Sequence, residues 1–162
     1  MLVIVLQDYP LSSGREVILL RDIERVFPVY GKSVKAELDL ALKQKAQVLE
    51  ATQGGKFQSD VDKFYRDLDA INSDVRAALI SGYSTLALKI SVAAEPSQVA
   101  DAFTQWDRIL ELVVREAFHV RAINQQLASV KTMTSGAEWQ KLFTLRDQAL
   151  QTATELKQIS GK

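Results

Sequence analysis

The stretch from Ser59 to Val92, with the sequence SDVDKFYRDLDAINSDVRAALISGYSTLALKISV, determines the fold class of this chain. Its large apolar residues recur every three or four positions, which places them on one face of an α-helix. We therefore predict a helix over 59–92, with Ser59 and Asp62 as a box-like cap at its start. Gly82 lies inside it and indicates a bend, the close approach of a neighbouring helix, or a glycine that the helix merely tolerates. The predicted buried face contains Val61, Phe64, Tyr65, Leu68, Ile71, Val75, Leu79, Leu86 and Ile90.

The segment before this stretch has the same helical period. A capping box formed by Ser13 and Glu16 predicts where it begins, and the glycines at 54–55 predict where it ends. Because Pro28 lacks a backbone amide and crowds the preceding turn, we expect a kinked helix over 15–52. Its predicted buried face contains Leu20, Ile23, Phe27, Tyr30, Val34, Leu38, Ala41 and Leu49.

Two further helices are predicted after residue 92. Pro96 suits the first turn of a third helix, at 96–131, because its missing amide would have been unpaired there. Ser135 and Glu138 form a capping box that opens a fourth helix, at 136–159. The predicted buried positions are Val99, Phe103, Trp106, Leu110, Val113, Val120 and Leu127 in the third helix, and Trp139, Leu142, Phe143, Leu145, Ala149, Leu150, Ala153 and Leu156 in the fourth.

The connections between these four helices are short, about five residues each, so consecutive helices should alternate in direction. We therefore predict an all-α fold, an elongated up-down-up-down four-helix bundle whose first helix is kinked at Pro28. The 162 residues suffice for one domain with a substantial core. Because Val-Ile-Val at 3–5 favours extended structure, the expected division is a short extended N-terminal arm at 1–14 and a single bundle domain at 15–162.

The composition excludes several classes of function. With 20 basic and 20 acidic residues, the chain has no net charge that would attract nucleic acid or an anionic membrane. It has no cysteine, which excludes disulfides, thiolate metal sites and thiol nucleophiles. The apolar run at 2–6 is far shorter than the ~20 residues that span a bilayer, and Arg15, the first basic residue, follows it, unlike in a secretory signal. We therefore expect no nucleic-acid partner, no membrane span and a cytoplasmic location.

The sequence REAFHV places Glu116 and His119 three residues apart, the spacing of two metal ligands on one helix face. Bundles that bind two metals with carboxylates need two such pairs, and this chain has one histidine, so only a homodimer could complete the site. If Trp106, Val113 and Val120 mark the centre of the buried stripe, Glu116 falls on its margin and His119 on its flank. We interpret them as a boundary glutamate and a histidine that either extends its ring toward solvent or hydrogen-bonds at the edge, and we predict no bound metal.

The third helix is apolar nearly all round between Ile109 and Val120. Val114 and Phe118 lie four residues apart and away from the buried stripe. Leu112 extends the apolar surface further around the helix. Such a helix either presents a patch that a partner covers or is covered by the N-terminal segment folding back. We predict Leu112, Val114 and Phe118 as partner-binding residues, for a protein partner or for self-association as a homodimer.

These observations rank the function classes. The sequence offers a core, caps and a surplus apolar surface, so we expect a non-enzymatic interaction or assembly module, such as an adaptor, a chaperone-like protein or a structural subunit. No catalytic residue and no cofactor is predicted, since any pair of base and nucleophile would have to use His119. The second-ranked function is a ligand- or metal-binding bundle that uses Asn72, Asn124 or a dimeric Glu116/His119 site. The third-ranked function is an enzyme that pairs carboxylates from different helices. A ligand binder should have a concave cavity, and an interaction module a flat apolar patch.

Overall fold

The computed structural model describes residues 23–133 and 135–160. Within these residues the regular structure is helical and no strand is present, which confirms the all-α fold class. The predicted arm at 1–14, the capping box at Ser13 and the buried position Leu20 lie outside the described residues. The elements are α2 (Ile23–Val26), the π-helix η2 (Tyr30–Val34), α3 (Lys35–Lys43), α4 (Lys45–Thr52), α5 (Gln58–Ser91), α6 (Pro96–Leu127), the 3-10 helix η3 (Val130–Thr132) and α7 (Gly136–Ser160).

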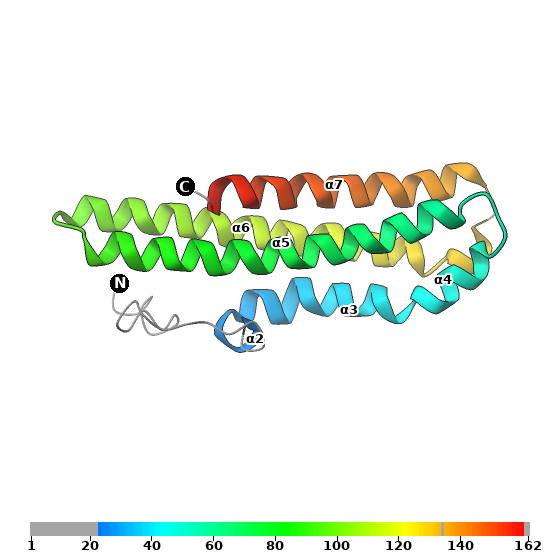
Figure 1. Cartoon of the computed structure of the whole chain (residues 1–162), viewed down its shortest axis with the longest axis horizontal. Coiled ribbons are helices and arrows are strands. Elements are labelled where there is room, and N and C mark those ends of the chain that lie inside the picture. Colours follow the sequence, from blue (N-terminus) through cyan, green and yellow to red (C-terminus); the bar gives the residue numbers. More distant parts are fainter. Residues whose placement is uncertain (1–22, 134, 161–162) are drawn as a thin grey trace.

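The long helices α5, α6 and α7 lie side by side, and α2, α3 and α4 run along them (Figure 1). The chain runs forward along α3 and α4, back along α5, forward along α6 and back along α7, an order compatible with the predicted up-down-up-down topology. With 34 and 32 residues, α5 and α6 are each about 50 Å long at about 1.5 Å per residue, so the bundle is elongated. Their hairpin extends beyond the C-terminal end of α7.

The first segment is interrupted near Pro28, as predicted. α2 ends at Val26, and the chain continues as the π-helix η2, in which the carbonyl of Tyr30 accepts a hydrogen bond from the amide of Lys35. A proline that lacks its amide and a π-turn both displace the helical hydrogen-bond pattern. A second break, at Gln44, separates α3 from α4. The single kinked helix that we expected is therefore a series of shorter helices.

The predicted buried face of this segment is confirmed from Ile23 to Ala41. Beyond Ala41, the buried residues are Val48 and Thr52, and the predicted Leu49 is half-buried. Val48 follows Ala41 by two helical turns, whereas Leu49 is rotated by about a further 100° away from the core. The correction therefore concerns one residue, and the face itself is unchanged.

The starts of α6 and α7 agree with the sequence. Pro96 occupies the first turn of α6, and the preceding Glu95 forms a capping box with Gln98. The hydroxyl of Ser135 accepts a hydrogen bond from the amide of Glu138 at 3.3 Å and donates one to its Oε1 at 3.0 Å. Both caps satisfy amides that the first helical turn would leave unpaired.

The start of α5 differs from the prediction. α5 begins at Gln58, with Phe57 at the N-cap position and no side-chain cap. The cap predicted for Ser59 and Asp62 is therefore wrong, because Ser59 already lies inside the helix. The glycine turn contacts the start of α5: the amide of Gln58 donates to the backbone oxygen of Gly55 at 3.3 Å, and Oε1 of Gln58 accepts a hydrogen bond from the amide of Gly54 at 3.1 Å.

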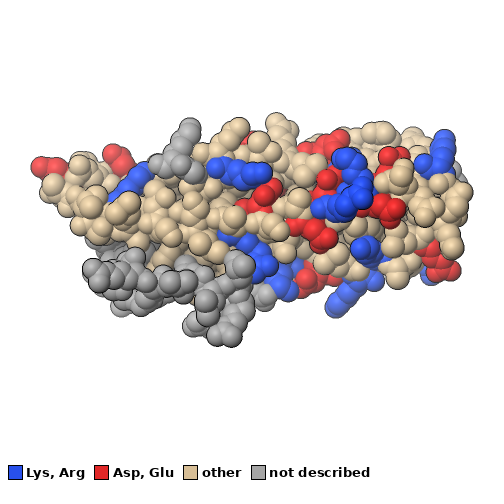
Figure 2. Space-filling model, viewed as in Figure 1, with Lys and Arg blue, Asp and Glu red and all other residues tan. Residues whose placement is uncertain are grey.

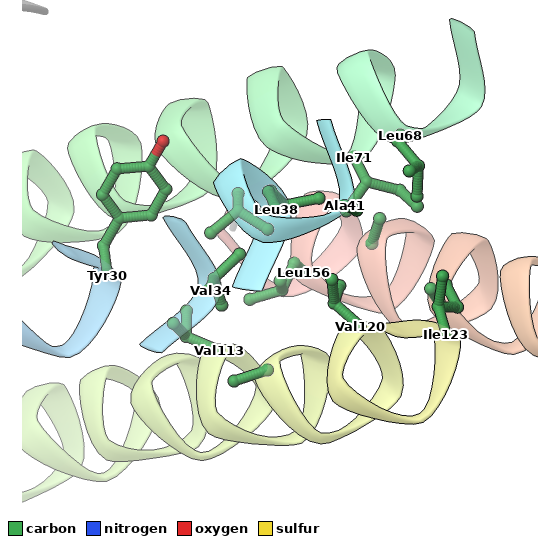
Figure 3. Packing of buried hydrophobic residues seen from close by; sticks show 14 of the residues in the cluster. Tyr30, Val34, Leu38, Ala41, Leu68, Ile71, Val113, Val120, Ile123 and Leu156 are labelled. Atoms are coloured by element: carbon green, nitrogen blue, oxygen red, sulfur yellow. The ribbon is translucent and has the colours of Figure 1, made fainter. Parts of the chain in front are cut away.

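The predicted face of α5 forms one side of the core. Its residues from Val61 to Leu86 are buried, and Ile90, near the hairpin, is half-buried. A Cβ atom on Gly82 would lie 2.5 Å from Cδ1 of Ile109 and 3.4 Å from Cζ3 of Trp106, so the close approach is the correct alternative for this glycine. Figure 3 shows side chains from the four sides of the bundle meeting at its centre, among them Val34, Leu38, Ile71, Val113, Val120 and Leu156.

The surface carries charges of both signs. On the face shown in Figure 2, basic and acidic side chains are interspersed, and no continuous basic patch is visible. Two ion pairs between described residues join α7 to α5: Nη1 of Arg146 lies 3.2 Å from Oδ2 of Asp67, and Nζ of Lys157 lies 3.6 Å from Oδ2 of Asp74. No helix in the described part of the chain combines the length and the apolar composition needed to cross a membrane.

Candidate functional site

α6 carries most of the candidate site residues, and it packs against three neighbours. These are the first segment, through η2 and α3, then α5, and then α7. Because neighbours surround it on three sides, its buried stripe is wide and is centred near Ile109, Val120 and Leu127. The buried residues of α6 are Ala102, Trp106, Ile109, Leu112, Val113, Glu116, Ala117, Val120, Ile123, Asn124 and Leu127.

Glu116 lies inside the bundle, with 0% of its surface exposed. The prediction that it falls on the margin of the stripe is wrong. That prediction centred the stripe on Trp106, Val113 and Val120, toward the side where Trp106 contacts Phe27 of the first segment, and left out the burial of α6 against α5 and α7. Relative to a centre near Ile109 and Val120, Glu116 is rotated by only about 30°.

The carboxyl group of Glu116 has no hydrogen-bond partner among the described residues. Burial, and then the negative charge of Asp74 on α5, raise its pKa from 4.5 to about 9. The group is therefore protonated and uncharged at neutral pH. Nζ of Lys157 on α7 lies 3.6 Å from Oδ2 of Asp74, so the charge of Asp74 has its own partner. A buried acid without a hydrogen bond costs stability, and such positions are candidates for function.

A sequence signal for this burial was present. Glu116 is preceded by apolar residues three, four and seven positions earlier and followed by apolar residues four and seven positions later, so its helical neighbourhood is apolar except for His119. That pattern indicates a buried position whichever side of the helix meets a particular neighbour. The residues are Ile109, Leu112, Val113, Val120 and Ile123.

His119 lies half-buried at the seam between α6 and α7. Its Nε2 is 3.1 Å from Oγ1 of Thr152 on α7, so of the two alternatives the structure has the hydrogen bond at the edge. Burial, and then the positive charge of Arg115, lower the pKa of His119, so the imidazole is uncharged at neutral pH. Glu116 is enclosed in the core, so the two side chains do not share one surface. Among the described residues, no group of three or more histidine, aspartate or glutamate side chains comes close enough to hold a metal ion.

The two asparagines that we considered as markers of a polar pocket join helices instead. The hydroxyl of Tyr30 donates a hydrogen bond to Oδ1 of Asn72, which connects η2 to α5. Nδ2 of Asn124 donates to the backbone oxygen of Glu37 at 2.8 Å and to its Oε2 at 2.9 Å, which connects α6 to α3. Such contacts are directional, so they align the first segment along its neighbours.

The three predicted partner-binding residues do not lie together. Leu112 is 1% exposed and belongs to the core, so its side chain is not available to a partner. Val114 and Phe118 are 41% and 60% exposed on the opposite side of α6. Being four residues apart on a helix, they are neighbours on the surface. We call this pair and the helix face around it the outer face of α6.

Charged side chains flank this apolar pair. The guanidinium carbon of Arg121 lies 5.5 Å from the centroid of the Phe118 ring, within the range of a cation–π contact. Nε of Arg121 also donates a hydrogen bond to Oε1 of Glu37 on α3 at 3.2 Å. On the other side, Oε1 of Glu111 lies 2.9 Å from Nη1 of Arg108. An acidic residue therefore precedes the apolar pair along α6, and a basic residue follows it.

A hollow on α5 does not bring the candidate polar residues together. Its volume is about 450 Å³, and among the described residues its lining comes from α5 alone. Neither Glu116, Asn72 nor Asn124 lines it, and the lining contains no carboxylate or histidine. The lining residues are Ser73, Arg76, Ala77, Ile80 and Ser81.

In comparisons with known proteins, no family model, no curated protein and no solved structure matches this chain. The function therefore has to be argued from the geometry of the chain itself. A helical bundle serves many unrelated functions, so the fold alone does not name one.

Proposed function

We propose that this chain is a non-enzymatic protein–protein interaction or assembly module, and that it docks partners on the outer face of α6. The observation that carries the proposal is the exposure of Val114 and Phe118 on a helix whose opposite face is packed against three neighbours. Removing apolar surface from water is favourable by about 25 cal/mol per Å², and this gain opposes the entropic cost of association. Because α6 is already held by its neighbours, a partner on this face is not needed for folding.

The chemistry of the outer face supports this proposal. Large aromatic residues and arginine are the side chains that most often dominate the energy of protein interfaces. Phe118 and Arg121 are both exposed and form a cation–π contact, which favours one arrangement of the ring and the guanidinium before a partner arrives. Preorganised side chains lose less conformational entropy on binding.

Site-specific photo-crosslinking tests the proposal. A benzophenone side chain replaces Phe118 in one variant and, in the matched control, Leu88, which is 63% exposed near the end of α5. In an extract of the native host, we expect irradiation to yield protein adducts from position 118 that Val114→Glu removes. The control should not yield these adducts. The same adducts from both positions, or none from position 118, would contradict a docking role for the outer face.

A second candidate function, a ligand- or metal-binding bundle, rests on Glu116. Its buried carboxyl group has no hydrogen-bond partner among the described residues, and a bound cation or hydrogen-bond donor would satisfy it. Elemental analysis of the purified protein and of a Glu116→Gln variant tests the metal form of this candidate. About one metal ion per chain or per dimer, lost in the variant, would favour it over the docking module.

A further inference from the structure

We propose that the outer face of α6 binds a second copy of this chain with the two α6 helices antiparallel, an inference that rests on the proposed function of this face. The exposed residues along it follow one another at intervals of alternately four and three residues, the spacing of the contact seam in a coiled coil. At about 100° per residue they lie within roughly 80° around the helix, opposite the buried stripe. We call them the outer stripe: Asp107, Glu111, Val114, Phe118, Arg121 and Gln125.

The outer stripe is symmetrical in position about its midpoint, which falls at the level of Glu116. Val114 and Phe118 lie two residues on either side of this level, and Glu111 and Arg121 lie five residues on either side. A two-fold axis through the midpoint therefore places each residue opposite its counterpart in the second copy. The counterparts are apolar with apolar, and acidic with basic.

These pairings favour an antiparallel arrangement over a parallel one. In the antiparallel pair, Val114 packs on Phe118 of the second copy, and Glu111 faces Arg121, each contact occurring twice by symmetry. In a parallel pair, Glu111 would face Glu111 and Arg121 would face Arg121, which brings like charges together. Repulsion of this kind is how natural helix pairs exclude the wrong orientation.

The contacts within one chain leave the charged residues available. Glu111 lies 2.9 Å from Arg108 and 3.7 Å from Arg115, and both arginines are on α6. Arg121 contacts Glu37 of α3. Glu111 and Arg121 nevertheless remain exposed, so each can gain a second partner without breaking these contacts. The intrachain contacts hold the two side chains beside the apolar pair.

The small size of the outer stripe indicates a weak dimer. The stripe has six residues, whereas a typical stable interface has about 20–30 residues on each side. The dimer should therefore dissociate on dilution, with a dissociation constant on the order of 100 µM. Its mass in solution should depend on protein concentration.

Charge exchange at the outer stripe tests the pairing. In sedimentation velocity over a range of concentrations, we expect Glu111→Arg and Arg121→Glu each to raise the dissociation constant of the wild-type dimer at least about tenfold. The variant with both substitutions restores opposite charges at both contacts, so it should recover most of the wild-type affinity. A wild-type chain that stays monomeric at millimolar concentration, or a double variant no better than the single ones, would overturn the inference.

Crosslinking tests the direction of the helices. The chain has no cysteine, so introduced cysteines are the sole thiols. In the antiparallel pair, residue 107 lies beside residue 125 of the second copy, whereas the two copies of residue 107 are about 27 Å apart along the helices. A short bismaleimide should therefore join Asp107→Cys to Gln125→Cys in a mixture and should not join Asp107→Cys to itself. The reverse pattern would show a parallel pair and overturn the inference.

The two proposals fail in different ways. If the wild-type chain is monomeric but position 118 still yields adducts with a different protein, the second copy is wrong and the docking function stands. If position 118 yields no adduct of any kind, both are wrong.

Discussion

Glu116 and Phe118 lie two residues apart on α6 and face opposite ways, about 160° apart around the helix. Glu116 places a carboxyl group in the apolar core, and Phe118 places an aromatic ring at the surface. Each residue has the chemistry expected of the other position. The inner face of this helix turn therefore has a polar residue where an apolar one is usual, and its outer face has an apolar residue where a polar one is usual.

The difference between them concerns what each departure costs. The buried carboxyl group loses its contact with water and gains no hydrogen bond from the described residues, so it lowers the stability of the fold. The exposed ring costs the fold little and instead leaves apolar area that a partner can cover. Substitutions at the inner position should change folding, and substitutions at the outer position should change association.

The largest expected effect is the pH dependence of stability. The pKa of Glu116 is raised from 4.5 to about 9 in the folded chain, so between these values the folded chain keeps a proton that the unfolded chain has lost. With respect to this group, the free energy of unfolding is therefore highest below pH 4.5, where both states carry the proton. It falls as the pH rises from 4.5 toward about 9. The free energy of unfolding should fall by up to about 1.4 kcal/mol per pH unit, or about 4 kcal/mol between about pH 5.5 and 8.5.

Glu116→Gln is the control for this prediction, because the amide does not titrate. His119 contributes with the opposite sign, since its pKa is lowered in the folded chain and its contribution to stability grows as the pH rises through the ordinary histidine range. Both chains keep His119, so the difference between their urea denaturation curves isolates Glu116. Equal pH slopes in the two chains would contradict the burial of an unpaired acid.

The second effect is a gain of stability at the inner position. Glu116→Met keeps an unbranched side chain of similar length and removes the polar group, so the free energy of unfolding at neutral pH should rise by about 2 kcal/mol. Glu111→Met, at an exposed position of the same helix, is the matched control and should change stability by less than about 0.5 kcal/mol. Chemical denaturation measures both. A loss of stability in Glu116→Met would show that the carboxyl group has a partner that stabilises the fold.

The third effect has the opposite sign and uses a buried polar residue that has partners. Asn124 donates two hydrogen bonds to Glu37, so Asn124→Ala should lower the free energy of unfolding by about 1–2 kcal/mol. Gln125→Ala, at the neighbouring exposed position, should have almost no effect. If Asn124→Ala is as stable as the wild-type chain, these hydrogen bonds do not hold α3 on α6.

The parts of the fold that were predictable from the sequence depend on local patterns. The period of α5 and the capping box at Ser135 involve residues within a few turns of each other, so their structural consequences are local as well. The second break, at Gln44, has no comparable signal, because it involves neither proline nor glycine.

The candidate site was only partly predictable, because burial on α6 depends on where three neighbours pack. Val114 and Phe118 were correctly placed outside the buried stripe. Glu116 and Leu112 were misplaced, since the stripe was centred on the side that meets the first segment. The width of a buried stripe depends on how the helices pack in the assembled bundle, so the pattern of apolar residues along one helix does not predict it.

The central claim, that the outer face of α6 serves association with a second copy and not folding, is tested most directly by sedimentation equilibrium of Phe118→Glu. Leu88→Glu, at an equally exposed position on α5, is the control, and both variants should melt at the wild-type temperature because neither residue is buried. At a concentration where the wild-type chain is largely dimeric, we predict a monomer mass for Phe118→Glu and the wild-type mass for Leu88→Glu. A wild-type mass for Phe118→Glu would contradict the account.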